Sequence, residues 1–136
     1  MLRRGGVAEL FGALDRGDLE IVTGFFRDDV VIVFGNATPV RGTAAFTELY
    51  AQVLGSLRGI RHDIHQVWRP VEDRDVLVVV MTVHYSRLDG AVVSVPCCNV
   101  LRLREGFVAD YRVYLDAGPV FAPYEGSAAQ IAPEII

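Results

Sequence analysis

Residues 106–121 contain the side chains whose types and spacing are the strongest candidates for catalysis or ligand binding. Strand side chains repeat every two residues, so the alternation in this stretch predicts one β-strand with two unlike faces. One face carries Asp110, Arg112 and Asp116, a charged row that is typical of acid–base chemistry. The other face carries Tyr111 among apolar neighbours, which is typical of a ligand cavity.

Burial decides between the two faces, because burying an unpaired charge is costly. In each long strand the more apolar set of alternate residues should face the helices. This set consists of the odd-numbered residues in 77–85, 93–103 and 107–115. The charged row is therefore predicted on the outer face, where Arg102, Arg104 or a second subunit can pair with it. Asp116 stays open, because it ends its strand and can turn towards the mouth of a cavity.

The predicted inner face has few polar groups, and three of them form a candidate catalytic site. A histidine ordinarily exchanges protons near neutral pH, and His62 is the only one expected to face inward. Asn99 and Tyr111 can donate hydrogen bonds to a developing oxyanion. Structural roles stay open, since a backbone carbonyl can satisfy His62, and Asn99 and Tyr111 can bond each other. The predicted substrate-binding residues are Phe34, Tyr50, Gln66, Trp68, Met81, Tyr85, Val113 and Asp116.

Composition and charge argue against several classes of function. The net charge of -4 and the pI near 5.3 provide no basic surface for nucleic acid or for an anionic membrane. All 13 basic residues are Arg, which removes a Schiff-base lysine mechanism. His65 and His84 fall on the outer parity, so no three-histidine metal site is expected, and no cofactor is expected either.

The remaining composition fits a cytoplasmic protein. No apolar run approaches the length of about 20 residues that crosses a bilayer, and the first ten residues do not resemble a signal peptide. Cys97 and Cys98 are adjacent in a strand and so point to opposite faces, which suits neither a disulfide nor a metal site. The length of 136 residues suits one domain, residues 1–136, with residues 122–136 as a loosely packed tail.

The periodicity of the chain predicts helices first and strands afterwards. Apolar residues at helical spacing over residues 7–26 are interrupted by Gly17 and Asp18, which should end one helix and cap the next. A short strand over residues 30–34 precedes a helix over residues 43–57 with Thr43 as its N-cap. Four strands joined by short turns follow, over residues 60–70, 76–88, 91–104 and 107–116. The prediction is an α+β fold in which three helices lie across a curled, mainly antiparallel sheet and enclose a pocket.

Four segments carry the spaced signatures of a known family: residues 14–19 (LDRGDL), 26–30 (FRDDV), 40–46 (VRGTAAF) and 101–112 (LRLREGFVADYR). In order and spacing they resemble the SnoaL-like, ketosteroid-isomerase-like branch of the NTF2-like superfamily, over about residues 7–121. The resemblance implies a cone-shaped α+β barrel, usually a homodimer, that holds a hydrophobic small molecule. The family includes ketosteroid isomerases, polyketide cyclases, enzymes like limonene-epoxide hydrolase, dehydratases and non-catalytic binding domains.

The catalytic positions that the resemblance implies are mostly not matched. The aspartate base of ketosteroid isomerases would fall at Phe34 or a neighbour, and the aspartate of their oxyanion hole corresponds to Asn99. The aspartate of SnoaL-like cyclases would fall at Val113. The Arg and Asp pair of epoxide hydrolases would fall near His84 and Ser86.

Two kinds of function follow as hypotheses. The first is an isomerase, cyclase or dehydratase that acts on a hydrophobic cyclic ketone or polyketide-like substrate, with His62 moving the proton while Asn99 and Tyr111 hold the oxygen. The alternative is a non-catalytic domain for hydrophobic-ligand binding or dimerisation, because every family carboxylate base is missing. In either case we expect a homodimer through the outer face of the sheet.

Overall fold

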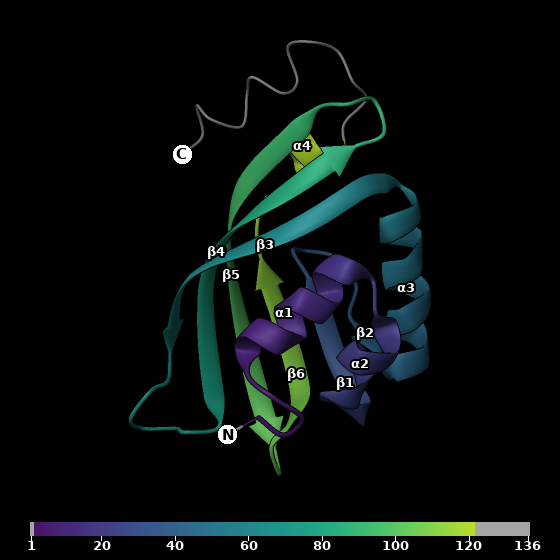
Figure 1. Ribbon diagram of the computed structural model, residues 1–136. Helices are drawn as coiled ribbons and strands as arrows, with labels where there is room; N and C mark the ends of the chain where they lie inside the picture. Colours follow the sequence, from purple (N-terminus) through teal and green to yellow (C-terminus); the bar gives the residue numbers. More distant parts are fainter. Residues whose placement is uncertain (1, 122–136) are drawn as a thin grey trace.

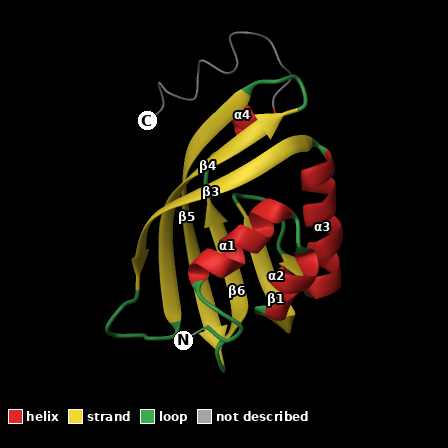
Figure 2. Cartoon of the chain, in the orientation of Figure 1, coloured by secondary structure: helices red, strands yellow, loops and turns green. Residues whose placement is uncertain are grey.

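The computed structural model describes residues 2–121 and has an α+β architecture in which helices cover one side of a curled sheet (Figures 1 and 2). The predicted tail, residues 122–136, lies outside the described residues. The elements in chain order are α1 (Val7–Arg16), α2 (Leu19–Gly24), β1 (Phe26–Phe34), β2 (Val40–Arg41), α3 (Thr43–Gly55), β3 (Leu57–Trp68), β4 (Val76–Arg87), β5 (Val92–Arg104), β6 (Phe107–Tyr114) and α4 (Gly118–Phe121). No helix among residues 2–121 is long and apolar enough to span a bilayer.

The break between the first two helices is formed by the two predicted residues. Gly17 ends α1 in the left-handed region, at φ 70°, and its N–H bonds back to the carbonyl groups of the last turn. Asp18 then caps α2 by accepting a hydrogen bond from the Ile21 N–H at 3.4 Å. The N-cap of α3 differs from the prediction: Gly42, at φ 89°, takes this position and Thr43 is already helical. A positive φ is easily adopted by Gly, which explains the shift by one residue.

The sheet has six strands in the order β2-β1-β6-β5-β4-β3. Strands β3 to β6 are consecutive antiparallel neighbours, as the short turns between them predict. β1 pairs with β6 in parallel, so the first and last long strands of the chain lie side by side in the sheet. The sheet is mixed and curled but does not close, because β2 and β3 remain as edges.

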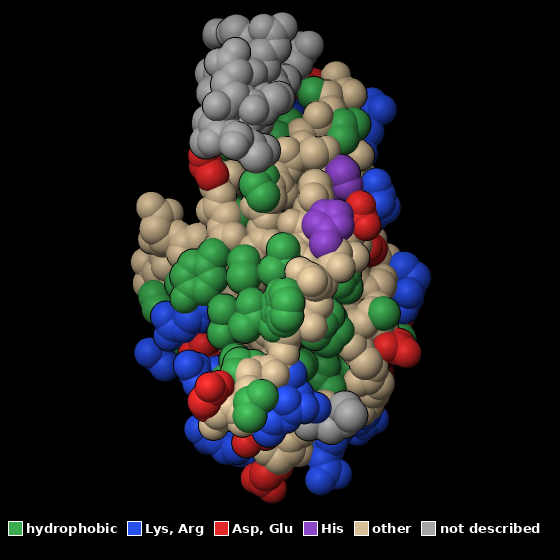
Figure 3. Space-filling model, turned by 90° about the vertical axis from the view of Figure 1, so that its left-hand side faces the viewer, with side chains coloured by type: hydrophobic (Ala, Val, Ile, Leu, Met, Phe, Trp, Pro, Cys, Tyr) green, Lys and Arg blue, Asp and Glu red, His purple; other side chains and the backbone are tan. Residues whose placement is uncertain are grey.

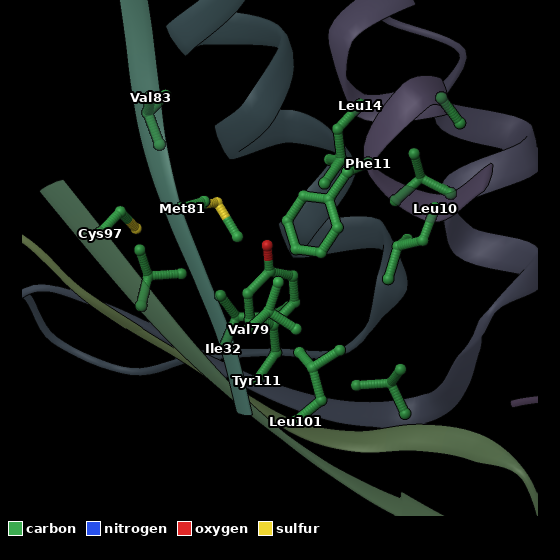
Figure 4. Packing of buried hydrophobic residues seen from close by; sticks show 14 of the residues in the cluster. Leu10, Phe11, Leu14, Ile32, Val79, Met81, Val83, Cys97, Leu101 and Tyr111 are labelled. Carbon is green, nitrogen blue, oxygen red and sulfur yellow. The ribbon is translucent and has the colours of Figure 1, made fainter. Parts of the chain in front are cut away.

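The core lies between the helices and the inner face of the sheet (Figure 4). The odd-numbered residues of β4 and β5 are buried as predicted, and Val79 and Leu101 have no exposed surface. The start of β6 departs from this pattern, because Val108 is fully buried and Ala109 only half-buried. Arg102 pairs with Asp110 and Leu103 with Val108, so a β-bulge reverses the alternation before Asp110.

Candidate functional site

A cavity of about 340 Å³ lies between the inner face of the sheet and the helices α1 and α3. Its walls are almost entirely apolar, which is typical of a site for a small hydrophobic ligand. All three predicted catalytic residues line this cavity: His62 from β3, Asn99 from β5 and Tyr111 from β6. Among the predicted substrate-binding residues, Phe34, Tyr50, Tyr85 and Val113 line it as well.

Two of the expected wall residues, Gln66 and Trp68, lie on the outside instead. His62 and Ile64 pair with inward-facing residues of β4, but the register of β3 shifts between Ile64 and Gln66. After this bulge Trp68 pairs with Val78 on the outer face, and 54% of its surface is exposed. The extra residue reverses the face that the following side chains use, so the alternation read from His62 fails.

Met81 and Asp116, which were also predicted to bind substrate, do not line the cavity. Met81 is buried behind the cavity, where its Sδ lies 3.9 Å from the Asn99 amide nitrogen. Asp116 accepts a hydrogen bond from the Gly118 N–H at 3.0 Å and lines a separate, open pocket. That pocket shares Phe34 with the main cavity. The possibility that Asp116 turns towards the main cavity is therefore not supported.

His62 is held by a carboxylate that the sequence analysis did not select. Its Nδ1 lies 2.5 Å from Oδ1 of Asp15, which comes from the last turn of α1. The backbone N–H of His62 also donates to both carboxylate oxygens of Asp15, at 3.1 and 3.2 Å. Asp15 thereby fixes both the strand and the ring, so that the ring carries its proton on Nδ1 and presents Nε2 as a proton acceptor.

The position of Asp15 follows from the helical repeat. Phe11 and Leu14 are on the buried face of α1, and Asp15 is one turn after Phe11. The Phe11 ring packs against the His62 ring with centroids 5.1 Å apart, so the same face of α1 supplies both the packing and the carboxylate. A carboxylate that continues an apolar helical face was the available signal, and the family motif in residues 14–19 contains it.

Asn99 and Tyr111 bond each other, which was the structural alternative for this pair. The Asn99 amide donates to the Tyr111 hydroxyl at 3.3 Å, and its oxygen accepts from the Cys97 thiol at 3.5 Å. Because its nitrogen faces Tyr111 and the Met81 sulfur, the amide is engaged by protein atoms. The Tyr111 hydroxyl accepts from Asn99 and so keeps its own proton free for a ligand. Figure 4 shows this hydroxyl directed away from its strand, towards Phe11 and Met81.

The phenol and thiol groups around the cavity are held in their neutral forms. Burial raises the pKa of Tyr85 well above its ordinary value, and the nearby Cys97 adds to this effect. Burial also raises the pKa of Tyr111, with further contributions from Tyr50, Cys97, Tyr85 and Asp15. The pKa of the Cys97 thiol rises to about 12, mainly through burial. These groups therefore act as hydrogen-bond donors rather than as anions.

The charged row of β6 has the outer position predicted for it, with a different partner. Asp110 pairs with Arg112 on the same strand at 3.0 Å, whereas Arg102 lies 3.7 Å from Asp73. The outer histidines bond hydroxyl groups: His65 lies 2.7 Å from Thr82 Oγ1, and His84 lies 2.7 Å from the Ser94 hydroxyl. Within residues 2–121, no group of three His, Cys, Asp or Glu side chains is arranged to hold a metal ion.

Comparison with known proteins agrees with this geometry. The SnoaL-like domain family matches residues 7–111. The chain belongs to this family. Among proteins with curated descriptions, none matches the sequence.

The chain has the NTF2-like fold, which it shares with several solved structures. An LEH-like epoxide hydrolase of M. tuberculosis has a TM-score of 0.73 at 20% identity, covering 94% of this chain and 89% of the other. TerC, co-crystallised with polyporic acid, has a TM-score of 0.72 at 19% identity, covering 82% and 88%. An NTF2-like protein of unknown function from Burkholderia pseudomallei has a TM-score of 0.76 at 16% identity, covering 84% and 90%. At these identities the likeness establishes the fold alone.

Proposed function

We propose that this SnoaL-like protein is a cofactor-independent enzyme of small-molecule metabolism, an isomerase, cyclase or dehydratase that acts on an uncharged cyclic ketone or polyketide-like substrate. The observation that carries the proposal is the Asp15–His62 pair at the wall of an apolar cavity. A histidine oriented by a carboxylate is an arrangement suited to general-base chemistry. Polyporic acid in TerC supports a small cyclic molecule as the kind of ligand.

In this mechanism each polar residue has a separate role. Asp15 holds the Nδ1 proton, and Nε2 of His62 takes a proton from the carbon beside the substrate carbonyl. The pair of electrons from the broken C–H bond moves towards the carbonyl oxygen. Tyr111 donates a hydrogen bond to that oxygen as its negative charge develops. Asn99 is a positioning residue, because its amide bonds the Tyr111 hydroxyl and leaves the phenolic proton for the substrate.

Exchange of a carbon-bound proton tests this chemistry without knowledge of the natural product. Purified protein is incubated in D₂O with 1-tetralone, and loss of the C2 proton signal is followed by NMR. We expect exchange above the buffer rate, and we expect His62→Ala to lower it by about 10²- to 10⁴-fold or to the buffer rate, whichever is reached first. The matched control is His65→Ala, which removes a histidine from the outer face of the same strand.

The outcomes separate the enzyme from a binding module. A wild-type rate equal to buffer contradicts the enzyme proposal. If 1-tetralone nevertheless binds, as shown by calorimetry, the alternative of a non-catalytic hydrophobic-ligand-binding domain is supported. An unchanged rate in His62→Ala assigns the exchange to another group and refutes the role of His62.

We further propose that the protein forms a homodimer through the outer face of the sheet. Register places Trp68, Val78 and Val100 in one outer row, with Val80 in the next. Figure 3 shows hydrophobic side chains gathered on one face of the molecule, and apolar patches of this kind favour association. Light scattering at micromolar concentration should give the mass of two chains, and a strictly monomeric species contradicts the proposal. A cytoplasmic location stays a prediction from the sequence.

A further inference from the structure

Tyr85 has a buried hydroxyl that the mechanism above does not use. Only 2% of the residue is exposed, yet its side chain lines the cavity. Within the described residues this hydroxyl makes no hydrogen bond, and the one aromatic ring that packs against the Tyr85 ring is Phe121, with centroids 6.5 Å apart. A polar group in a buried side chain normally has a hydrogen-bond partner, so an unpaired hydroxyl in a cavity-lining residue favours a ligand atom that bonds it.

The sheet register places Tyr85 and Tyr111 at different points along the inner face of the sheet. Tyr85 pairs with Val93 of β5, whereas Tyr111 pairs with Leu101 of the same strand. The inward-facing residues Val95, Cys97 and Asn99 of β5 lie between these two positions. The two phenols therefore enter the cavity from different points along the sheet, which favours two separate ligand atoms over one shared oxygen.

His62 is a near neighbour of Tyr85 and is joined to Tyr111 through the Phe11 ring. It pairs with Val83, the inward-facing residue that precedes Tyr85 on β4. On the other side, the Phe11 ring contacts both the His62 ring and the Tyr111 ring, with centroids at 5.1 and 6.5 Å. A ligand that reaches both phenols therefore passes the proposed base.

We propose that the cavity selects an uncharged ring compound with two oxygen functions, a carbonyl that accepts from Tyr111 and a second oxygen that bonds Tyr85. This inference rests on the proposed function and names the substrate class of the same site. Among residues 2–121 no Arg lines the cavity, so its wall has no permanent positive charge to balance an anionic ligand. The volume of about 340 Å³ matches a small ligand of a few fused rings rather than an extended chain.

A pair of probes that differ by one oxygen tests the proposal. 1-Tetralone has the carbonyl alone, and 5-hydroxy-1-tetralone adds a hydroxyl at the far end of the bicycle. Dissociation constants are measured by calorimetry at pH 7 for the wild type, Tyr85→Phe, Tyr111→Phe and Tyr114→Phe. The last variant is the matched control, because Tyr114 lies on the outer face with 54% of its surface exposed.

The wild type should bind the hydroxylated probe roughly 2- to 10-fold more tightly, the range expected for one added hydrogen bond. Tyr85→Phe should remove this preference. Tyr111→Phe should weaken the binding of both probes by a similar factor, so the preference for the hydroxylated probe should remain. Tyr114→Phe should bind as the wild type does. Phe preserves the ring, and the melting temperature of each variant checks the fold.

The proposal is overturned if the wild type shows no preference, if neither probe binds, or if Tyr85→Phe keeps the preference. The exchange of the C2 proton by the wild type is measured separately and depends on His62. If exchange occurs without a preference between the probes, the substrate class is wrong and the proposed function stands. If the preference is present without exchange, the binding inference stands and the proposed chemistry is wrong.

Discussion

Replacing Asp15 by Asn changes the protonation of His62 while almost preserving shape. In the wild type the carboxylate accepts from the Nδ1 of His62 at 2.5 Å and from its backbone N–H at 3.1 and 3.2 Å. An Asn oxygen can still accept from the backbone, but its NH₂ group then faces the ring. The favoured imidazole tautomer becomes the one with its proton on Nε2, which cannot act as a base towards the cavity.

The size of the effect follows from the hydrogen bond that is lost. A hydrogen bond to a charged group contributes about 1.5–3 kcal/mol, which corresponds to about a 10- to 150-fold lower exchange rate. Nitrogen-15 NMR of the labelled protein reports the tautomer of His62, and the D₂O assay with 1-tetralone reports the rate. Glu48→Gln, an equivalent change at an exposed site on α3, should alter neither.

The reasoning is refuted if Asp15→Asn keeps the Nδ1-protonated tautomer and the wild-type rate. A lower rate with an unchanged tautomer would also count against it, because the effect would then come from a shift of α1. The tautomer is therefore the decisive measurement, and the melting temperature shows whether α1 still packs on β3.

Three further predictions concern stability and reactivity. Between about pH 9 and 12 the unfolded chain releases the Cys97 proton while the folded protein keeps it, so the free energy of unfolding should fall with rising pH, by up to about 1.4 kcal/mol per pH unit for this thiol. Denaturant titrations should show a shallower fall in Cys97→Ala; an equal slope contradicts this assignment. At pH 8, in protein diluted until it is monomeric, a maleimide should label the half-buried Cys98 much faster than Cys97, as mass spectrometry can check, and equal rates would show that the cavity opens readily. Gly17→Ala should lower stability by about 1–2 kcal/mol in thermal unfolding, because the site has φ 70° and the new Cβ would lie 3.1 Å from Leu54; unchanged stability would show that α1 can end differently.

The elements could be predicted because local rules agreed with the tertiary structure. Gly17 and Asp18 gave the break between the helices, and the alternation in β4 and β5 gave the buried face. The alternation failed where a β-bulge inserts one residue, at His65 and at Ala109, because neither position carries a Gly or Pro that marks the irregularity.

The candidate site could be predicted only where it follows from strand parity. His62, Asn99 and Tyr111 face the cavity for this reason. The Asp15–His62 contact joins residues 47 positions apart, and it depends on how α1 crosses β3, which the helical repeat of α1 alone does not determine. The partner of Asp110 was missed because Arg112, on the same strand, and Arg102, opposite, are both within reach, and parity does not distinguish them.

The parallel pairing of β1 with β6 has a consequence for how the protein is made. Strand β1 (Phe26–Phe34) cannot pair with β6 (Phe107–Tyr114) until that later segment has been synthesised. Pairing of segments so distant in sequence also slows folding. During synthesis, the emerging chain therefore exposes its apolar inner surface until nearly the last described strand has left the ribosome, and during this interval it is open to aggregation or to chaperone binding.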